Sequence, residues 1–99
     1  MDAPEPSFTH TRALTIEWGD CDPAGIVFYP RYFAFFDAST AALFSAALGM
    51  PKIAWRAAHG IEGIPMVDTR GRFLVPCAYG DAVTIESRIA RFGRSSFDV

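Results

Sequence analysis

The sequence contains few cysteines, few histidines and no long apolar run, and each shortage excludes a class of protein. Cys21 and Cys77 form neither a CxxC pair nor a metal-ligand cluster, and two cysteines are too few for a disulfide scaffold. No stretch approaches the roughly 20 uninterrupted apolar residues of a membrane span. The start, MDAPEPSFTH, lacks the cationic and apolar regions of a secretory signal. We therefore expect a reduced, cytoplasmic protein with no membrane partner.

Charge and size narrow the possibilities further. A net charge of -2 and a pI near 5.5 give no general attraction to nucleic acid, so we expect no nucleic-acid partner. Ninety-nine residues suit one domain with a small core. Because 51% of these residues are hydrophobic, which is high for so short a domain, much apolar surface is expected to be buried against another copy.

The first half of the chain predicts a strand followed by one long helix. Residues 1–10 read as a loose arm, and the alternation in ALTIEW, residues 13–18, predicts a strand. Pro30 fits the first position of a helix that should run to about residue 48 and stop at Gly49. Apolar residues occupy most faces of this helix, which is typical of a buried helix.

The second half predicts a short helix and then strands. KIAWRAAHG is helical, PMVDTRGRFLVP is extended, and VTIESRIA alternates as a strand does. RFGRSS reads as a hairpin connection, and FDV begins a further strand at the end of the chain. We therefore expect an α+β fold in which an antiparallel sheet wraps one long central helix. We also expect the C-terminal strands to be missing from this chain.

The stretch WGDCDPAGIVFYP places Asp20 and Asp22 directly before the long helix. One interpretation is a surface turn, in which aspartate, proline and glycine serve only the backbone conformation. The other is a catalytic site, because a helix N-terminus offers free N–H groups to an oxyanion beside a carboxylate base or nucleophile. The residues alone leave both interpretations open.

Other candidates for nucleophile or base are weak. His10 falls in the expected arm, and His59 near a short helix end reads as a surface residue. There is no G-x-S-x-G motif for a serine nucleophile. Cys21 has no histidine near it in sequence, and a buried cysteine is more often inert packing.

Two charged groups elsewhere each have two interpretations. Asp37 is either a solvent-facing helix residue or a polar group aimed into a ligand pocket. Three arginines surround the last turn: Arg88, Arg91 and Arg94. They form either a solvated edge of the sheet or a site that binds phosphate groups.

The segment EWGDCDPAGIVFYPRYFAFFDAST closely resembles the active-site segment of the 4-hydroxybenzoyl-CoA thioesterase family, which has the hotdog fold. The resemblance continues through GIEGIPMVDTRGRFLVPCAYGDAVTIESRIARFGRSSF. It implies that Asp22 is the catalytic carboxylate, that Asp20 supports it, and that the backbone N–H of Tyr29 polarises the thioester carbonyl. Asp37 matches a family position near the acyl group.

The resemblance implies an enzyme that hydrolyses an acyl-CoA thioester, such as 4-hydroxybenzoyl-CoA, to the free acid and CoA. Asp22 would attack the carbonyl or activate water, and no metal or redox cofactor is implied. The expected substrate contacts are an acyl pocket shaped by Phe28, Phe33, Phe36 and Asp37, and a CoA phosphate grip from Arg94 helped by Arg91. The run RFGRSSF is less basic than in the family member that acts on the aromatic substrate.

A homodimer, further assembled as a homotetramer, is the expected state. The alternative function is a non-catalytic acyl-CoA binding module on the same fold, because a fold does not determine a function.

Overall fold

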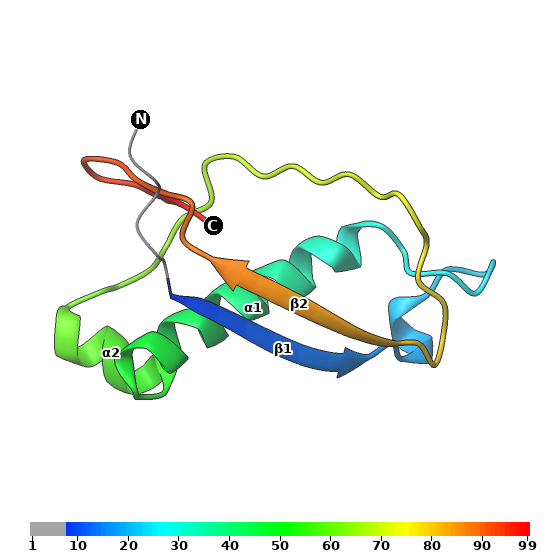
Figure 1. The fold of residues 1–99 in the computed structure, drawn as a ribbon, viewed down its shortest axis with the longest axis horizontal. Coiled ribbons are helices and arrows are strands. Elements are labelled where there is room, and N and C mark those ends of the chain that lie inside the picture. The colour runs from blue at the N-terminus through cyan, green and yellow to red at the C-terminus, as the bar shows by residue number, and fades with distance from the viewer. Residues whose placement is uncertain (1–7) are drawn as a thin grey trace.

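The computed structural model describes residues 8–99, in which a two-stranded sheet lies along one long helix (Figure 1). The elements in chain order are the strand β1 (Thr9–Thr15), the 3-10 helix η1 (Trp18–Asp20), the helices α1 (Pro30–Leu48) and α2 (Lys52–His59), and the strands β2 (Ala82–Arg88), β3 (Arg91–Phe92) and β4 (Phe97–Asp98).

Local capping signals set the ends of both helices, as the sequence predicts. Pro30 occupies the first position of α1, where its missing N–H leaves no hydrogen bond unmade. Gly49 ends this helix in the left-handed conformation, with φ of 66°, and donates its N–H to the carbonyl of Ser45. Gly60 ends α2 in the same conformation, with φ of 63°. The predicted bounds of the long helix are confirmed.

The sheet pairs β1 with β2 in antiparallel register, from Thr9 opposite Arg88 to Thr15 opposite Ala82. Alternate residues of both strands face α1, as the alternation in the sequence predicts. The predicted arm needs correction, because Thr9 and His10 already belong to β1; residues 1–7 lie outside the described part. The predicted first strand also ends early. Trp18 lies in η1 with 62% of its surface exposed, because the chain turns there.

Within one chain α1 is buried on one side only. Ser39 and Leu43 face the sheet and are buried, whereas Phe36 is 39% exposed. The prediction of a helix buried on most sides is therefore wrong for a single copy. A two-stranded sheet covers only one side of α1, so apolar side chains on the other sides of the helix face solvent.

The buried hydrophobic residues are few: Ile16 and Val27 lie near the start of α1, and Leu43 and Trp55 lie in its second half and in α2. Trp55 of α2 is 1% exposed, its ring centroid lies 5.8 Å from that of Phe44, and its indole N–H donates to the hydroxyl of Ser45 over 3.2 Å. The hairpin of β3 and β4 packs there too, with the Phe97 ring 5.2 Å from that of Phe44. This hairpin confirms the turn expected at RFGRSS.

The segment from residue 61 to residue 77 returns from α2 towards the N-terminal end of α1 without forming a strand (Figure 1). The strand expected over residues 65–76 is therefore wrong. Several apolar side chains of this segment face solvent: Met66, Val67, Leu74 and Val75. Among residues 8–99, no single helix is long and apolar enough to cross a membrane, although α1 and α2, bent by 68°, pass that test as a pair.

Candidate active site

Asp22 begins a tight turn that ends at Gly25. The Gly25 N–H donates to the Asp22 carbonyl over 2.9 Å, and the positive φ of 79° at position 25 explains the need for glycine there. The Asp22 Oδ1 atom accepts a 2.8 Å hydrogen bond from the Ala24 N–H, so the Asx-type turn expected from the composition exists. This bond uses one carboxylate oxygen. The other has no hydrogen-bond partner among residues 8–99.

This turn is tied to a segment more than fifty residues later in the chain. Residues Cys21 and Val27 pair across the turn as an isolated bridge. The Val27 N–H donates to the Cys77 carbonyl over 2.9 Å, and the Tyr79 N–H donates to the Gly25 carbonyl over 3.2 Å. Backbone hydrogen bonds, within the turn and to residues 77–79, therefore hold the turn that carries Asp22.

Asp20 has a different role, because both of its carboxylate oxygens are engaged. Oδ2 accepts from the Glu17 N–H over 2.9 Å, and Oδ1 accepts from Nη2 of Arg31 over 3.0 Å. Its carbonyl accepts from the Phe28 N–H over 2.9 Å, and the residue is only 7% exposed. Asp20 thus fastens η1 to the first turn of α1, and Asp22 is the aspartate with an oxygen left for chemistry.

The N-terminus of α1 provides a free backbone donor. Tyr29 caps the helix, and Pro30, which follows it, has no N–H. The next two N–H groups are used, because Arg31 donates to the Phe28 carbonyl and Tyr32 donates to that of Tyr29. Within the described residues the Tyr29 N–H has no acceptor. A free N–H at a helix N-terminus suits a developing oxyanion.

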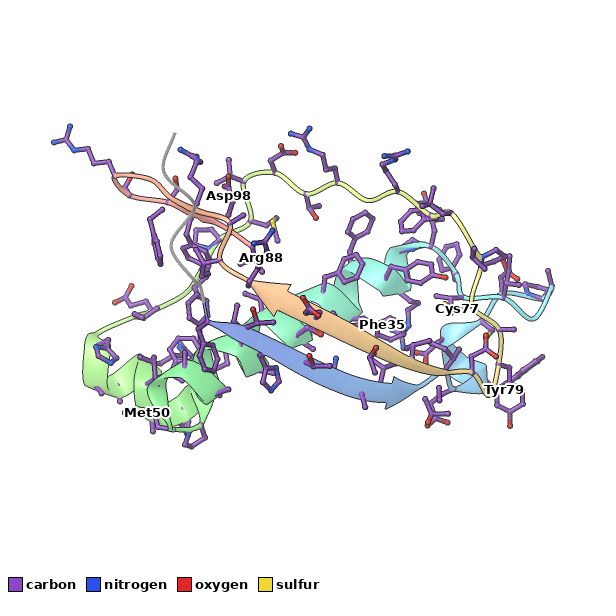
Figure 2. All side chains as sticks on the ribbon, in the orientation of Figure 1. Phe35, Met50, Cys77, Tyr79, Arg88 and Asp98 are labelled. Carbon is purple, nitrogen blue, oxygen red and sulfur yellow. The ribbon has the colours of Figure 1, made fainter. Side chains whose placement is uncertain are left out.

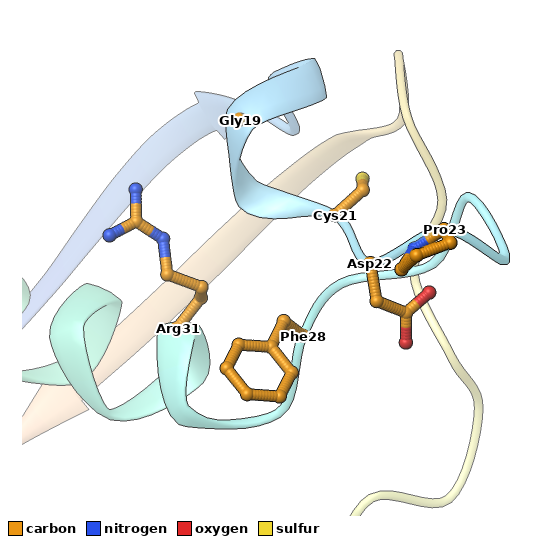
Figure 3. A pocket seen from close by; sticks show the side chains of 6 residues that line it. All are labelled: Gly19, Cys21, Asp22, Pro23, Phe28 and Arg31. Carbon is orange, nitrogen blue, oxygen red and sulfur yellow. The ribbon is translucent and has the colours of Figure 1, made fainter.

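A shallow depression of about 390 Å³ opens beside Asp22 (Figure 3). Its lining residues are Gly19, Cys21, Asp22, Pro23, Phe28 and Arg31. The pKa of the Cys21 thiol is raised by desolvation and by the negative charges of Asp20, Asp22 and Asp81. A raised pKa keeps the thiol protonated at neutral pH, which makes Cys21 a poor nucleophile.

The three phenylalanines expected to shape an acyl pocket lie in different places. Phe28 lines the depression and is 50% exposed. Phe36 lines a second cavity of about 200 Å³ between α1, β2 and the segment from residue 72 to residue 77. Phe33 packs edge-on against Phe36, with ring centroids 6.2 Å apart, but lines neither space. Asp37 is exposed and also lines neither.

The arginines expected to grip CoA lie far from Asp22 within one chain. Arg91 forms an ion pair with Asp98 over 3.1 Å, and Arg94 is exposed in the hairpin turn. This hairpin packs at Phe44, fourteen residues beyond Pro30 and so about 21 Å along the helix axis. Figure 2 accordingly places Asp98 and Tyr79 towards opposite ends of the sheet.

Two residues near the site carried no sequence signal. Arg31 pairs with an aspartate eleven residues earlier, a spacing that no regular element explains. The Tyr32 hydroxyl accepts a hydrogen bond from the Cys77 N–H over 3.1 Å, and burial raises the pKa of Tyr32.

His10 faces α1 with its Nδ1 atom buried and unpaired within residues 8–99. In the same range, no three His, Cys, Asp or Glu side chains are grouped to hold a metal ion.

Comparison with known proteins assigns this arrangement to a family. The family model of the thioesterase-like superfamily matches residues 16–99. The 4-hydroxybenzoyl-CoA thioesterase of Pseudomonas sp. (strain CBS-3) is 41% identical over 90 residues, which cover 88% of this chain and 62% of that protein.

Two solved structures have the same fold. That of the 4-hydroxybenzoyl CoA thioesterase from Pseudomonas sp. strain CBS-3 gives a TM-score of 0.81 at 38% identity, covering 90% of this chain and 64% of that one. A gentisyl-coenzyme A thioesterase gives 0.76 at 32% identity, covering 89% and 69%. Both neighbours are hotdog-fold thioesterases, so the predicted fold is confirmed. The chain spans a little over three fifths of the length of the curated relative.

Proposed function

The chain belongs to the thioesterase-like superfamily, and we propose that it hydrolyses an acyl-CoA thioester to the free acid and CoA. One observation carries the proposal. A carboxylate with an unpaired oxygen, on Asp22, stands on a braced turn that leads within seven residues to the free N–H of Tyr29. A base or nucleophile and an oxyanion donor are the two parts that acyl transfer needs.

In this mechanism Asp22 acts at the thioester carbon. It either attacks that carbon directly or removes a proton from a water molecule that does. The Tyr29 N–H stabilises the negative charge that develops on the carbonyl oxygen. The carbon–sulfur bond then breaks and the sulfur takes a proton. After direct attack by Asp22, water hydrolyses the mixed anhydride between Asp22 and the acyl group, which releases the acid and restores the carboxylate. In the other route the water oxygen is already bonded to the acyl carbon, and breaking the carbon–sulfur bond releases the acid. The step needs no metal or redox cofactor.

The acyl group is proposed to be aromatic. The support is the name of the relative, which acts on 4-hydroxybenzoyl-CoA, and the aromatic surface around the first turns of α1. In this proposal Phe28, Phe33 and Phe36 contact the acyl group and Asp37 lies near it. A cytoplasmic location belongs to the same proposal, in keeping with the free thiols of Cys21 and Cys77.

Thiol release from a panel of aromatic and aliphatic acyl-CoAs tests the function. Release from at least one aromatic thioester supports the enzyme. Tight binding of acyl-CoA without any thiol release would instead support the non-catalytic binding module.

Replacing Arg94 by Ala should raise KM far more than it lowers kcat. Contacts to the CoA phosphates are remote from the carbonyl and stabilise ground state and transition state alike. The effect should shrink at high salt, because exposed charge contacts are screened. Steady-state kinetics at two ionic strengths measures both effects, with Arg91→Ala as the companion variant. An unchanged KM in both variants would place the nucleotide elsewhere.

The protein is proposed to be a homodimer, assembled further as a homotetramer. A second copy can cover the apolar surface that one copy leaves exposed. The exposed apolar side chains of α1 and of the segment from residue 61 to residue 77 offer surface for that contact. Sedimentation at micromolar concentration should show a dimer or tetramer. A stable, folded monomer that hydrolyses acyl-CoA would refute the proposal.

A further inference from the structure

The depression beside Asp22 lacks most of the side chains expected to contact the acyl group. Its lining includes Phe28 but not Phe33, Phe36 or Asp37. An acyl group that follows those three side chains along α1 therefore lies outside the depression. The depression remains open to another part of the substrate.

Arg31, which lines the depression, lies on a different side of α1 from these three side chains. Because an α-helix turns by about 100° per residue, they project roughly 140–240° away from Arg31 around the helix axis. Figure 3 shows the Asp22 carboxylate and the Arg31 guanidinium at opposite ends of the depression, with the Phe28 ring between them. The acyl surface and the depression thus extend from Asp22 in different directions, as the two halves of a thioester extend from its carbonyl carbon.

Arg31 is held in place yet retains free donors. Its Nη2 atom binds Oδ1 of Asp20 over 3.0 Å, and the side chain of Asp20 is only 10% exposed. The Arg31 side chain itself is 49% exposed. A guanidinium has five N–H donors, and within residues 8–99 the Nε and Nη1 atoms of Arg31 have no acceptor. This ion pair therefore leaves donors of Arg31 available to a ligand.

The charges around the depression favour a neutral acceptor for these donors. Asp20 already balances the positive charge of Arg31, and the carboxylate of Asp22 at the other end repels an anion. An amide carbonyl carries no net charge and accepts a hydrogen bond from a guanidinium. In an acyl-CoA the pantetheine arm offers such a group, because two methylene groups join the sulfur to its nearest amide.

We propose that the depression binds the pantetheine arm of the leaving thiol and that Arg31 donates a hydrogen bond to the carbonyl of the amide nearest the sulfur. The inference rests on the proposed thioester hydrolysis and adds the binding site of the leaving group. Phe28 contacts the methylene groups next to the sulfur. Asp20 is a positioning residue that holds Arg31 through their ion pair.

A matched pair of truncated thioesters tests the inference in the complete protein. Both carry the 4-hydroxybenzoyl group, one on N-acetylcysteamine, which keeps the amide, and one on 1-pentanethiol, in which methylene groups replace it. The measured quantity is the ratio of their kcat/KM values, and comparison between variants cancels the intrinsic reactivity of the two thiols. In Arg31→Met, which removes every side-chain donor, this ratio should fall about tenfold, the lower end of the range for a hydrogen bond to a charged group, because Arg31 is half-exposed.

Three further variants separate the donor of Arg31 from the net charge of the protein and from its stability. Lys52→Met makes the same kind of change at the start of α2, outside the depression, and should leave the ratio unchanged. Arg31→Lys keeps a cationic donor and should retain more of the preference than Arg31→Met. If Arg31→Met unfolds because the Asp20 carboxylate loses its partner, Arg31→Met combined with Asp20→Asn removes both charges and should show the same fall.

Binding of the non-hydrolysable 4-hydroxyphenacyl thioethers of both thiols, measured by NMR titration, separates the two proposals. Absence of hydrolysis of every thioester, together with an Arg31-dependent preference for the thioether that carries the amide, would refute the enzyme and leave the inference standing. A ratio that Arg31→Met leaves unchanged, or an equal loss on both thioesters as for a group that acts on the sulfur or on the fold, would overturn the inference.

Discussion

Replacing Asp22 by Asn should lower kcat by about 10²–10⁴, the usual cost of losing a positioned base. Asparagine keeps the shape of the side chain, and its amide oxygen can still accept the hydrogen bond from the Ala24 N–H. It cannot act as a base or a nucleophile. The variant should therefore fold and bind substrate with little change, and only turnover should be lost. Single-turnover thiol release, with circular dichroism and substrate binding alongside, measures the three properties separately.

The neighbouring residues supply the controls. Asp20→Asn should lower the melting temperature, because Arg31 loses a charged partner at a buried carboxylate, and its effect on kcat should follow that loss of structure. Cys21→Ser should retain most activity, since the raised pKa keeps the thiol out of the chemistry. Hydrolysis by Asp22→Asn at close to the parent rate would return both aspartates to a purely structural role.

Replacing Tyr29 by Pro should lower kcat by about 10²–10³, the usual cost of removing one oxyanion donor. Proline removes the N–H of that position and nothing else from the backbone. The φ of −54° at Tyr29 lies within the range of proline, and within residues 8–99 the N–H has no partner to lose. The helix should therefore remain, while the carbonyl oxygen of the substrate loses its donor.

Tyr29→Ala is the matched control, because it removes the same side chain and keeps the N–H. The ratio of kcat between the alanine and proline variants isolates the contribution of the backbone donor. Equal rates in the two variants, with equal helix content by circular dichroism, would show that the oxyanion is stabilised elsewhere.

Local sequence was sufficient for the features that depend on neighbouring residues. The ends of α1 follow from Pro30 at its start and Gly49 at its end, and both act within one turn of the helix. The β3–β4 hairpin and the inward face of β2 also follow from short patterns. The turn at Asp22 belongs to the same group, because aspartate, proline and glycine determine its conformation within four residues.

Short sequence patterns did not predict the features that depend on contacts between residues far apart in the chain. The alternation that predicted a strand through Trp18 continues past the point where η1 begins, because period-two patterning cannot mark the end of a strand. The extent of burial of α1 was likewise overestimated, since it depends on how many strands cover the helix and not on the helix's own apolar residues.

The two aspartates show most clearly which features the sequence predicts and which only the tertiary structure decides. The residues around them allowed a structural turn or a catalytic site for either, and only the resemblance to a family favoured Asp22. The tertiary structure decided that Asp20 is bound, because the first turn of α1 brings Arg31 to it and η1 brings the Glu17 N–H. The same folding leaves Asp22 with a free oxygen and carries the hairpin arginines to the opposite end of α1. Local conformation follows from neighbours in sequence, whereas the availability of a charge follows from what the fold packs against it.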